Sequence, residues 1–280
     1  MYPVLGCDRL APLVVRLVVE APRIAAKRQP GQFVIVHLHE GAERIPLTIA
    51  EADPSAGTIT LVVQSVGKST ADLCAVSAGD VIRDVAGPLG RPTDLLERGH
   101  AVCVAGGVGS AVVAPIAAAL SARGVRVTSV VGARTQAQLL LVDQLTSIGD
   151  VVVCTDDASA GRAGLVSDAL GDICRDGGVD AVYAVGPVAM MQACAEVTRP
   201  LRIPTTVSLN SIMVDGTGMC GGCRVSVGGR TAYACVDGPE FDGHQVDFAL
   251  LADRLTTYHD FERTAADRGR GVCTDLGATS

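Results

Sequence analysis

The chain has 280 residues, of which 48% are hydrophobic, and it carries a formal net charge of −7 at pH 7. This length suggests two domains, or one domain with a small appendage. The acidic balance argues against a nucleic-acid partner, which would favour a clustered basic surface. No run of about 18 uncharged apolar residues predicts a membrane span.

Ten cysteines occur, and the N-terminal stretch MYPVLGCDRLAPLVV lacks the basic start of a signal peptide. This usage favours a reducing, cytoplasmic setting, where clustered cysteines are more often metal ligands than disulfides. Six of the ten are scattered, several of them in apolar runs, and are expected to be packing residues without chemistry. They are Cys7, Cys74, Cys103, Cys154, Cys174 and Cys194.

Residues 1–98 are predicted to form a small antiparallel β-barrel. Short alternating runs such as LVVRLVVEA and QFVIVHLHE are separated by Gly, Pro and Asp. Many short strands at this spacing are typical of a barrel.

Residues 99–204 predict a doubly wound, parallel-sheet α/β domain, because strand patterns alternate with helical ones. Strands are expected at 101–107, 125–133, 150–157 and 180–187, and helices at about 110–123, 135–148, 164–175 and 188–198. Ligands bind such sheets at the carboxyl ends of the strands. The sequence has glycine-rich turns at several of these ends.

The remaining residues predict a small cysteine-containing module at 205–250 and a C-terminal segment at 251–280. TTVSLNS is expected to be a last strand, and VDFALLADRLTTYHDFERTAAD a helix. The final stretch, DRGRGVCTDLGATS, predicts a disordered tail.

The turn GGVGS, residues 106–110, lies between a buried strand and a helix. Backbone N–H groups and the helix dipole at such a place favour a phosphate. The turn is not a full GxGxxG fingerprint, and Arg134 rather than an acidic residue follows the second strand. A nucleotide site and a plain tight turn both remain open.

Two stretches of the barrel region, ERIPLTIA and QSVGKST, contain groups that suit a phosphate. Arg44 could pair with a pyrophosphate, and GKST could offer backbone donors and hydroxyls. VGKST is not a Walker loop, because the earlier glycine at the required spacing is missing. The alternative is a solvated arginine and a polar hairpin turn.

Residues 215–235 contain the strongest signal, a D-x4-C-x2-C-x11-C array that begins with DGTGMCGGC. Its first three positions match the C-x4-C-x2-C spacing of plant-type [2Fe–2S] ferredoxins, with Asp215 in place of the leading cysteine. Zinc is the alternative, although structural zinc sites usually have two paired knuckles and only one CxxC occurs here. Asp215 is either a ligand or a turn residue.

A small β-barrel, a nucleotide-binding α/β domain and a C-terminal cysteine loop follow one another in the chain. This order resembles the ferredoxin–NADP reductase-like electron-transfer subunits. Seven motifs are similar to those of the small (alpha), sulfide dehydrogenase-like subunits of NADH-dependent reduced ferredoxin:NADP oxidoreductases. They are ERIPLTIA, VGKST, GPLG, GGVGSAVVAP, TDD, SLNSIMVDGTGMCGGCRV and ACVDGPEFDGHQVDF. The electron-transfer subunits of dihydroorotate dehydrogenase, which carry four cysteines, are a second group of relatives.

The resemblance implies three sets of cofactor-binding residues and no catalytic side chain. FAD would lie on the barrel against Arg44, Pro46, Leu47, Thr48, Gly67, Lys68, Ser69 and Thr70. NAD(H) would lie over Gly106, Gly107, Gly109, Ser110, Asp156, Asp157, Gly186 and Pro187. The [2Fe–2S] ligands would be Asp215, Cys220, Cys223 and Cys235. One departure is Val185, which stands where related reductases often have a cysteine.

The implied function is hydride transfer between NAD(H) and FAD and single-electron transfer between FAD and the cluster. The implied partner, in a heterodimer, is a larger flavoprotein with [4Fe–4S] clusters, similar to the glutamate synthase small subunit. It would handle NADP(H) and ferredoxin in electron bifurcation. The alternatives are an NAD-dependent dihydroorotate dehydrogenase subunit and a zinc-stabilised nucleotide-binding regulator. Because of Arg134, the residues alone do not separate NAD from NADP.

Overall fold

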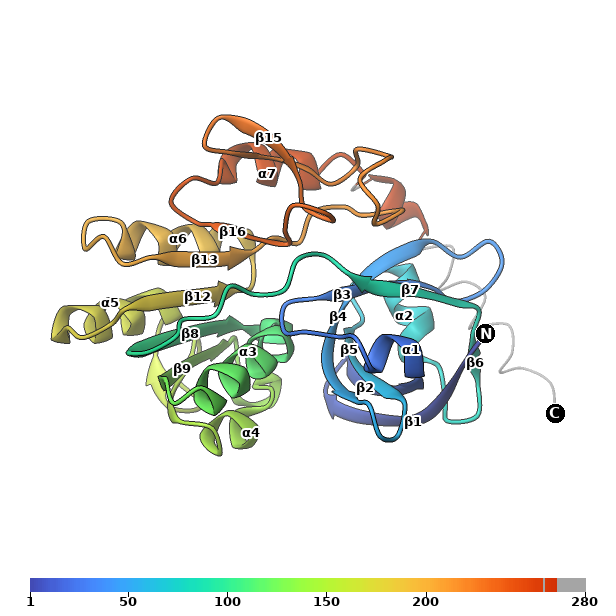
Figure 1. The fold of residues 1–280 in the computed structure, drawn as a ribbon, viewed down its shortest axis with the longest axis horizontal. Helices are drawn as coiled ribbons and strands as arrows, with labels where there is room; N and C mark the ends of the chain where they lie inside the picture. Colours follow the sequence, from blue (N-terminus) through green and yellow to red (C-terminus); the bar gives the residue numbers. More distant parts are fainter. Residues whose placement is uncertain (259, 266–280) are drawn as a thin grey trace.

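The computed structural model describes residues 1–258 and 260–265. Its N-terminal part is an antiparallel sheet of seven strands in the order β6-β1-β2-β5-β4-β3-β7, which curls into a nearly closed barrel (Figure 1). The strands are β1 (Tyr2–Ala11), β2 (Val14–Glu20), β3 (Phe33–His37), β4 (Arg44–Asp53), β5 (Thr58–Gln64), β6 (Val81–Ile82) and β7 (Asp84–Leu89). Two short helices, α1 (Pro22–Ala25) and α2 (Lys68–Cys74), accompany the strands. The predicted barrel is confirmed.

Alternating apolar residues build the core of the barrel. Leu17 and Val19 on β2 point inward, where they meet Ile49 of β4 and Leu61 of β5. All four side chains are fully buried. Successive strand residues point to opposite faces, so this alternation dictates which side of each strand faces the core.

The second part is a seven-stranded sheet in the order β11-β10-β9-β8-β12-β13-β16. Its strands are β8 (His100–Gly106), β9 (Arg126–Ala133), β10 (Asp150–Thr155), β11 (Arg162–Ala163), β12 (Ala181–Val185), β13 (Thr205–Ser208) and β16 (Glu240–Asp242). All neighbours are parallel except β16, which pairs antiparallel with β13 at the edge. The expected doubly wound sheet is confirmed, with an antiparallel strand added at one side.

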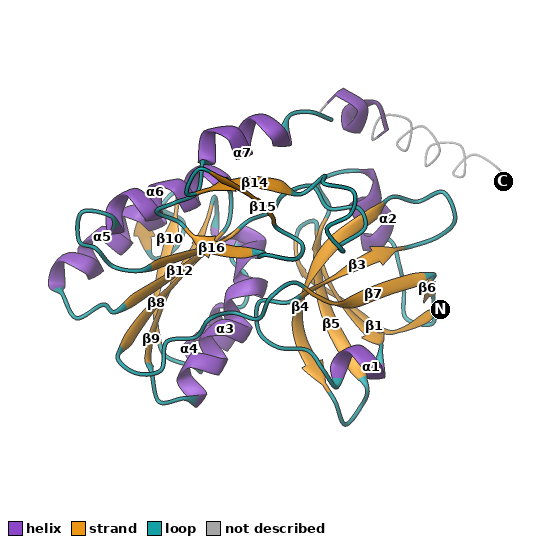
Figure 2. Ribbon diagram, turned by 45° about the horizontal axis from the view of Figure 1, so that its top comes forward, coloured by secondary structure: helices purple, strands orange, loops and turns teal. Residues whose placement is uncertain are grey.

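Helices cover both faces of this sheet (Figure 2). Helix α3 (Ser110–Ala122) packs on one face, whereas α5 (Val166–Asp176) and α6 (Val188–Thr198) pack on the other. The predicted helix at 135–148 is wrong in its extent, because the chain forms only a 3-10 turn, η2 (Gln136–Gln138), and a short α4 (Val142–Thr146). Leu140 interrupts it by entering a small core that also contains Val14 and Val62 of the barrel.

The C-terminal module consists of a hairpin, β14 (Arg224–Val227) and β15 (Arg230–Tyr233), together with β16 and helix α7 (Phe248–Leu255). The predicted long helix is interrupted rather than continuous: α7 ends at Leu255, where Thr256 and Thr257 donate hydroxyl hydrogen bonds to the carbonyls of Asp253 and Arg254. The chain is helical again at 260–265. The predicted disordered tail, with Cys273, lies outside the described residues from position 266 onward. None of the helices in the described part is long and apolar enough to cross a membrane.

Candidate functional site

Three of the predicted glycine-rich and acidic turns lie at the carboxyl edge of the parallel sheet. The turn 106–110 follows β8, Asp156 and Asp157 follow β10, and Gly186 and Pro187 follow β12. Strands β8 and β12 are direct neighbours, and β10 is separated from β8 by β9. This edge is where open α/β sheets bind their ligands.

Glycine is required where the first and third of these turns touch. A Cβ atom on Gly109 would lie 2.2 Å from the carbonyl oxygen of Val185. A Cβ on Gly106 would lie 2.6 Å from the sulfur of Met190. Gly107, with φ of +54°, instead has open space where a side chain would be. The two turns therefore pack backbone to backbone and leave an uncovered surface at Gly107.

Ser110 begins helix α3 directly behind this surface. It is fully buried, and its hydroxyl has no hydrogen-bond partner among the described residues. An orphaned buried hydroxyl at the start of a helix of 13 residues fits a nucleotide phosphate, because the free N–H groups there also attract anions. The residues at this turn thus suit the group that the sequence predicts.

A groove of about 570 Å³ lies beside the turn after β10, lined by Thr135, Gln136, Ala137, Asp157 and Ser159. Ser159 donates to Oδ1 of Asp157 from its hydroxyl (2.6 Å) and from its backbone N–H (3.0 Å). These hydrogen bonds hold the pKa of Asp157 below its usual value. The groove is therefore polar and presents a negative charge, whereas Arg134 does not line it.

The predicted flavin residues on β4 divide between its two faces. Leu47 packs with the barrel core, so Arg44, Pro46 and Thr48, at alternate positions, share the outer face. The side chain of Arg44 is 40% exposed, and its guanidinium lies 3.7 Å from the carboxylate of Asp84. An exposed cation beside half-buried Pro46 and Thr48 fits a flavin with its pyrophosphate.

The second predicted flavin segment forms the start of helix α2, with Gly67 as its N-cap. Here the side chains already have partners. Lys68 pairs with Asp72 at 2.6 Å, and Thr70 Oγ1 accepts the N–H of Gly67 at 3.0 Å. The side chain of Lys68 could therefore bind a phosphate at this turn only if it left Asp72.

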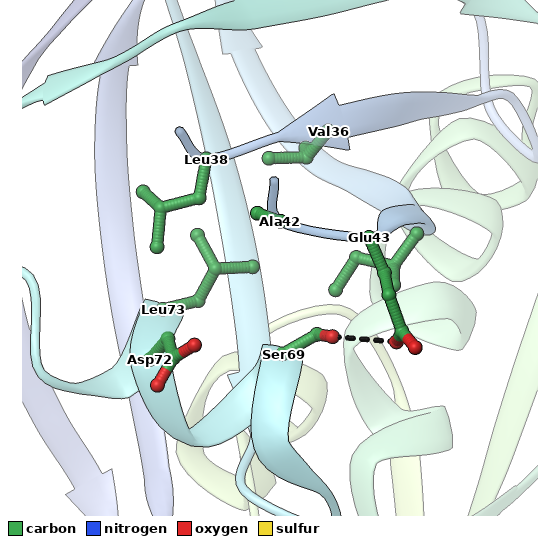
Figure 3. Close-up of a pocket in the computed structure, with 8 residues that line it drawn as sticks. Val36, Leu38, Ala42, Glu43, Ser69, Asp72 and Leu73 are labelled. Carbon is green, nitrogen blue, oxygen red and sulfur yellow. Dashed lines mark hydrogen bonds between the residues drawn. The ribbon is translucent and has the colours of Figure 1, made fainter. Parts of the chain in front are cut away.

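Ser69 connects this helix to the strand that carries Arg44. Its hydroxyl donates a 2.7 Å hydrogen bond to Glu43, the residue before Arg44, beside a small cavity of about 10 Å³ (Figure 3). The contact brings the two predicted flavin segments together. The cavity has room for a water molecule at most and is not itself a cofactor site.

In the C-terminal module, Cys223 and Cys235 are brought together and buried. The Sγ atom of Cys223 donates to that of Cys235 at 3.2 Å, and each residue is 1% exposed. Burial, and then the hydrogen bond from Cys223, raises the pKa of Cys235 to about 12. The structure thus brings together the last two of the four residues predicted as [2Fe–2S] ligands.

Asp215 and Cys220 form the other half of the loop. The carboxylate of Asp215 accepts the N–H of Cys220 at 2.9 Å and the N–H of Thr217 at 2.8 Å. These hydrogen bonds, that from Thr217 above all, lower the pKa of Asp215. Asp215 thus organises the turn, and lone pairs of its carboxylate oxygens remain for a further partner.

The four predicted ligands lie as two pairs rather than as one cage. Within the described ranges, no three His, Cys, Asp or Glu side chains are close enough to hold a single metal ion. A tetrahedral zinc ion needs four ligands around one point, whereas each iron of a two-iron cluster takes two protein ligands. The pairing fits [2Fe–2S] better than zinc.

Glycines let this loop fold tightly against the barrel. Gly216, with φ of +76°, lies so close to β7 and β3 that a Cβ would be 2.6 Å from Leu89 and 3.0 Å from Ile35. Only glycine combines this conformation with this approach. The loop therefore lies next to strand β3, which pairs with the proposed flavin strand β4.

A buried carboxyl group at the junction of the modules was not anticipated from the sequence. Glu240 on β16 accepts a 2.9 Å hydrogen bond from Thr93 in the segment between barrel and sheet. Its second oxygen has no partner among the described residues, and desolvation raises the pKa of Glu240 to about 7. No local pattern around PEFDG signals this burial, since it depends on contacts with the barrel.

Comparison with known proteins agrees with this arrangement. Residues 210–247 match the family model of the iron–sulfur cluster binding domain of dihydroorotate dehydrogenase B. This match spans the loop that contains Asp215, Cys220, Cys223 and Cys235.

Two curated proteins illustrate the relationship over most of the chain. A homologue of the dihydroorotate dehydrogenase B (NAD(+)) electron transfer subunit from Thermotoga maritima is 47% identical over 250 residues, which is 89% of this chain and 89% of that protein. The dihydroorotate dehydrogenase B (NAD(+)) electron transfer subunit of Bacillus caldolyticus is 36% identical, over 85% of this chain and 94% of that protein.

A solved structure extends the similarity to the whole fold. A chain of the NADH-dependent reduced ferredoxin-NADP oxidoreductase, determined in work on flavin-based electron bifurcation, superimposes with a TM-score of 0.91 at 43% identity. The match covers 96% of this chain and 97% of that one. The identities and the coverage show that the chain belongs to the family of the dihydroorotate dehydrogenase B electron transfer subunits and their homologues.

Proposed function

We propose that this protein is the NAD(H)-linked electron-transfer subunit of a flavin and iron–sulfur oxidoreductase. One observation carries the proposal: two buried thiols, Cys223 and Cys235, are paired at 3.2 Å in a loop that packs on the barrel strands next to β4. An iron–sulfur loop beside a reductase-type barrel and a nucleotide-binding sheet is the arrangement that a carrier between nicotinamide and iron needs.

The bound groups would supply the chemistry, with the flavin exchanging a hydride with nicotinamide and single electrons with the iron–sulfur cluster. The chain's own residues bind and orient these groups. The nucleotide would be held over β8 and β12 by the two glycine turns, which contain Gly106, Gly107, Gly109 and Ser110 in the first and Gly186 and Pro187 in the second. Asp156 and Asp157 would form its outer rim.

The outer face of β4 would carry the flavin. Arg44 would neutralise its pyrophosphate, and Pro46 and Thr48 would contact its ring system, while Leu47 supports the strand from the core side. The turn that begins at Gly67 would lie against the phosphates. Lys68, Ser69 and Thr70 are tied to neighbouring groups, so backbone N–H groups are the donors that this turn would contribute.

Asp215 with Cys220, and Cys223 with Cys235, would hold one iron each. This division follows the two pairs in the structure, and thiolates with a carboxylate suit iron. The exposed position of Cys220 would bring one end of the cluster to the surface. Electrons could leave there toward a second protein.

Because the relatives are electron transfer subunits, we infer that this chain works with a partner subunit. The similarity to the NADH-dependent reduced ferredoxin-NADP oxidoreductase supports a specific form of that partner. It would be a larger flavoprotein with [4Fe–4S] clusters, similar to the glutamate synthase small subunit, which handles NADP(H) and ferredoxin. This subunit would then be the NAD(H) arm of an electron-bifurcating heterodimer.

Absorbance, flavin and iron analysis of the purified protein tests the cofactors. A yellow-brown protein with about one FAD and about two irons per chain is expected. A colourless protein that contains zinc and no flavin would be a nucleotide-binding regulator instead.

The names of the relatives favour a second candidate, the electron-transfer subunit of a dihydroorotate dehydrogenase. Purification of the complex from its source cell separates the two. A partner that oxidises dihydroorotate and passes the electrons to this chain would establish the second candidate. A partner that exchanges electrons with NADP(H) and ferredoxin would establish the first.

A further inference from the structure

One arginine of the C-terminal helix contacts the turn between the two cysteines of the CGGC motif. Nη2 of Arg254, in the last turn of α7, donates a 3.2 Å hydrogen bond to the carbonyl oxygen of Gly222. The side chain of Arg254 is half-buried. Since Gly222 directly precedes Cys223, the guanidinium binds the peptide unit that leads into a proposed ligand.

The helix that carries Arg254 is firmly attached to the same module. The N–H of Asp247 donates to the carbonyl of Ser226 on β14 at 3.0 Å, and the Asp247 carboxylate caps the helix through the N–H of Leu250 at 2.9 Å. Phe248 and Leu251 are buried against the module's core. Figure 2 shows α7 alongside the β14–β15 hairpin. Arg254 therefore projects from a fixed support.

A second arginine lies on the CGGC turn. Nη1 of Arg224 would be 3.0 Å from a Cβ atom placed on Gly221. Two cations thus flank a loop whose four proposed ligands are anionic when they bind metal. The location of both charges is set by the fold and not by the cysteine spacing.

Resting on the proposed iron–sulfur function, we propose that Arg254 is a positioning residue for the cluster loop. Its hydrogen bond holds the CGGC turn, and its positive charge raises the reduction potential of the centre. An added electron increases the negative charge of the centre, so a nearby cation stabilises the reduced form more than the oxidised form. Half-burial limits the screening of this charge by salt.

Three variants of the full chain test the two effects, which are read by two separate measurements. Arg254→Lys keeps the charge, and Arg254→Met removes both the charge and the donor while keeping a long unbranched stem. Arg175→Met is the matched control, because Arg175 also lies in the last turn of a helix, α5, and is paired with Asp172. The measurements are the midpoint potential of the cluster, by spin-resonance-monitored titration, and the rate of iron release to a chelator.

We expect Arg254→Met to lower the midpoint potential and to release iron several-fold faster than the unmodified chain. Arg254→Lys should stay close to the unmodified potential, and Arg175→Met should change neither property. Loss of the cluster from the Met variant alone would support the positioning role.

An unchanged potential in Arg254→Met, or equal shifts in the Lys and Met variants, would overturn the charge effect. Unchanged iron release would overturn the positioning role. If the unmodified chain shows no two-iron spectrum at all, the proposed function fails before this inference is reached, so the two failures are distinguishable.

Discussion

Thr93 Oγ1 donates a 2.9 Å hydrogen bond to Oε1 of Glu240, although 147 positions separate the two residues in the chain. The barrel loop at Gly31 closes over the same contact, because a Cβ there would lie 2.3 Å from Thr93 Oγ1 and 2.9 Å from Glu240 Oε1. Barrel, connecting segment and C-terminal module therefore meet at one buried carboxyl group.

This carboxyl group should make stability depend on pH. The folded pKa of Glu240 is about 7, raised from 4.5 by burial, so between these values the folded state holds a proton that the unfolded state has released. Stability from this group is fully present below the unfolded pKa and is lost as pH rises through the folded pKa. The loss is on the order of 3 kcal/mol.

Urea unfolding at about pH 5.5 and about pH 8 checks this expectation. In Glu240→Gln the side chain at position 240 is neutral at both pH values, so this variant should lose less stability than the unmodified chain as the pH rises. Parallel pH profiles for the two proteins would show that Glu240 is ionised in the folded state at both pH values.

Replacing Asp215 by cysteine tests whether its carboxylate binds iron. We expect Asp215→Cys to retain a [2Fe–2S] spectrum with a changed midpoint potential, because a thiolate replaces a harder oxygen ligand. Redox titration followed by absorbance measures the change. The same potential and spectrum in both proteins would mean that Asp215 serves the turn alone.

Removal of a buried thiol should remove the metal. Cys223→Ser or Cys235→Ser is expected to lose most of the iron, since each breaks the buried pair. Cys174→Ala is the control, because that cysteine is also buried, at 6% exposure, but lies on α5 in the packed core. Equal iron contents in all three variants, measured colorimetrically, would contradict the ligand assignment.

Asp157 should favour NADH over NADPH, because its carboxylate lines the groove at the end of β10 and would repel a 2′-phosphate. In Asp157→Asn we expect the preference for NADH to shrink several-fold, seen as a change in the ratio of the two dissociation constants. Asp143→Asn, at the exposed start of α4, is the control. A ratio that is the same in all three proteins would assign coenzyme choice to another residue.

Close packing of the two glycine turns should be sensitive to a single methyl group. Gly109→Ala places a carbon 2.2 Å from the Val185 carbonyl oxygen and is expected to cost about 1–3 kcal/mol of stability and to weaken NADH binding. Gly171→Ala is the control, because its Cβ meets Val197 at an ordinary 3.7 Å. Calorimetry of both variants measures the difference, and equal stability would show that the turns can separate.

Most elements around the site follow from local pattern. The predicted strand at 101–107 and helix at 110–123 are found at His100–Gly106 and Ser110–Ala122. The turn between them was anticipated because glycine placement and hydrophobic periodicity are properties of a short stretch. The predicted helix at 135–148 failed because burial of Leu140 against the barrel overrides local helical preference.

The amino-acid pattern is enough to establish the order of barrel, parallel sheet and cysteine loop, and the spacing that singles out Asp215 and the cysteines. Chain connectivity and side-chain periodicity encode these features directly. Three contacts become visible in the folded chain alone: Cys223 faces Cys235, Arg254 binds the CGGC turn, and the carboxyl group of Glu240 is enclosed against Thr93. The first two contacts depend on how the C-terminal module folds on itself, and the third on how that module packs against the segment that follows the barrel.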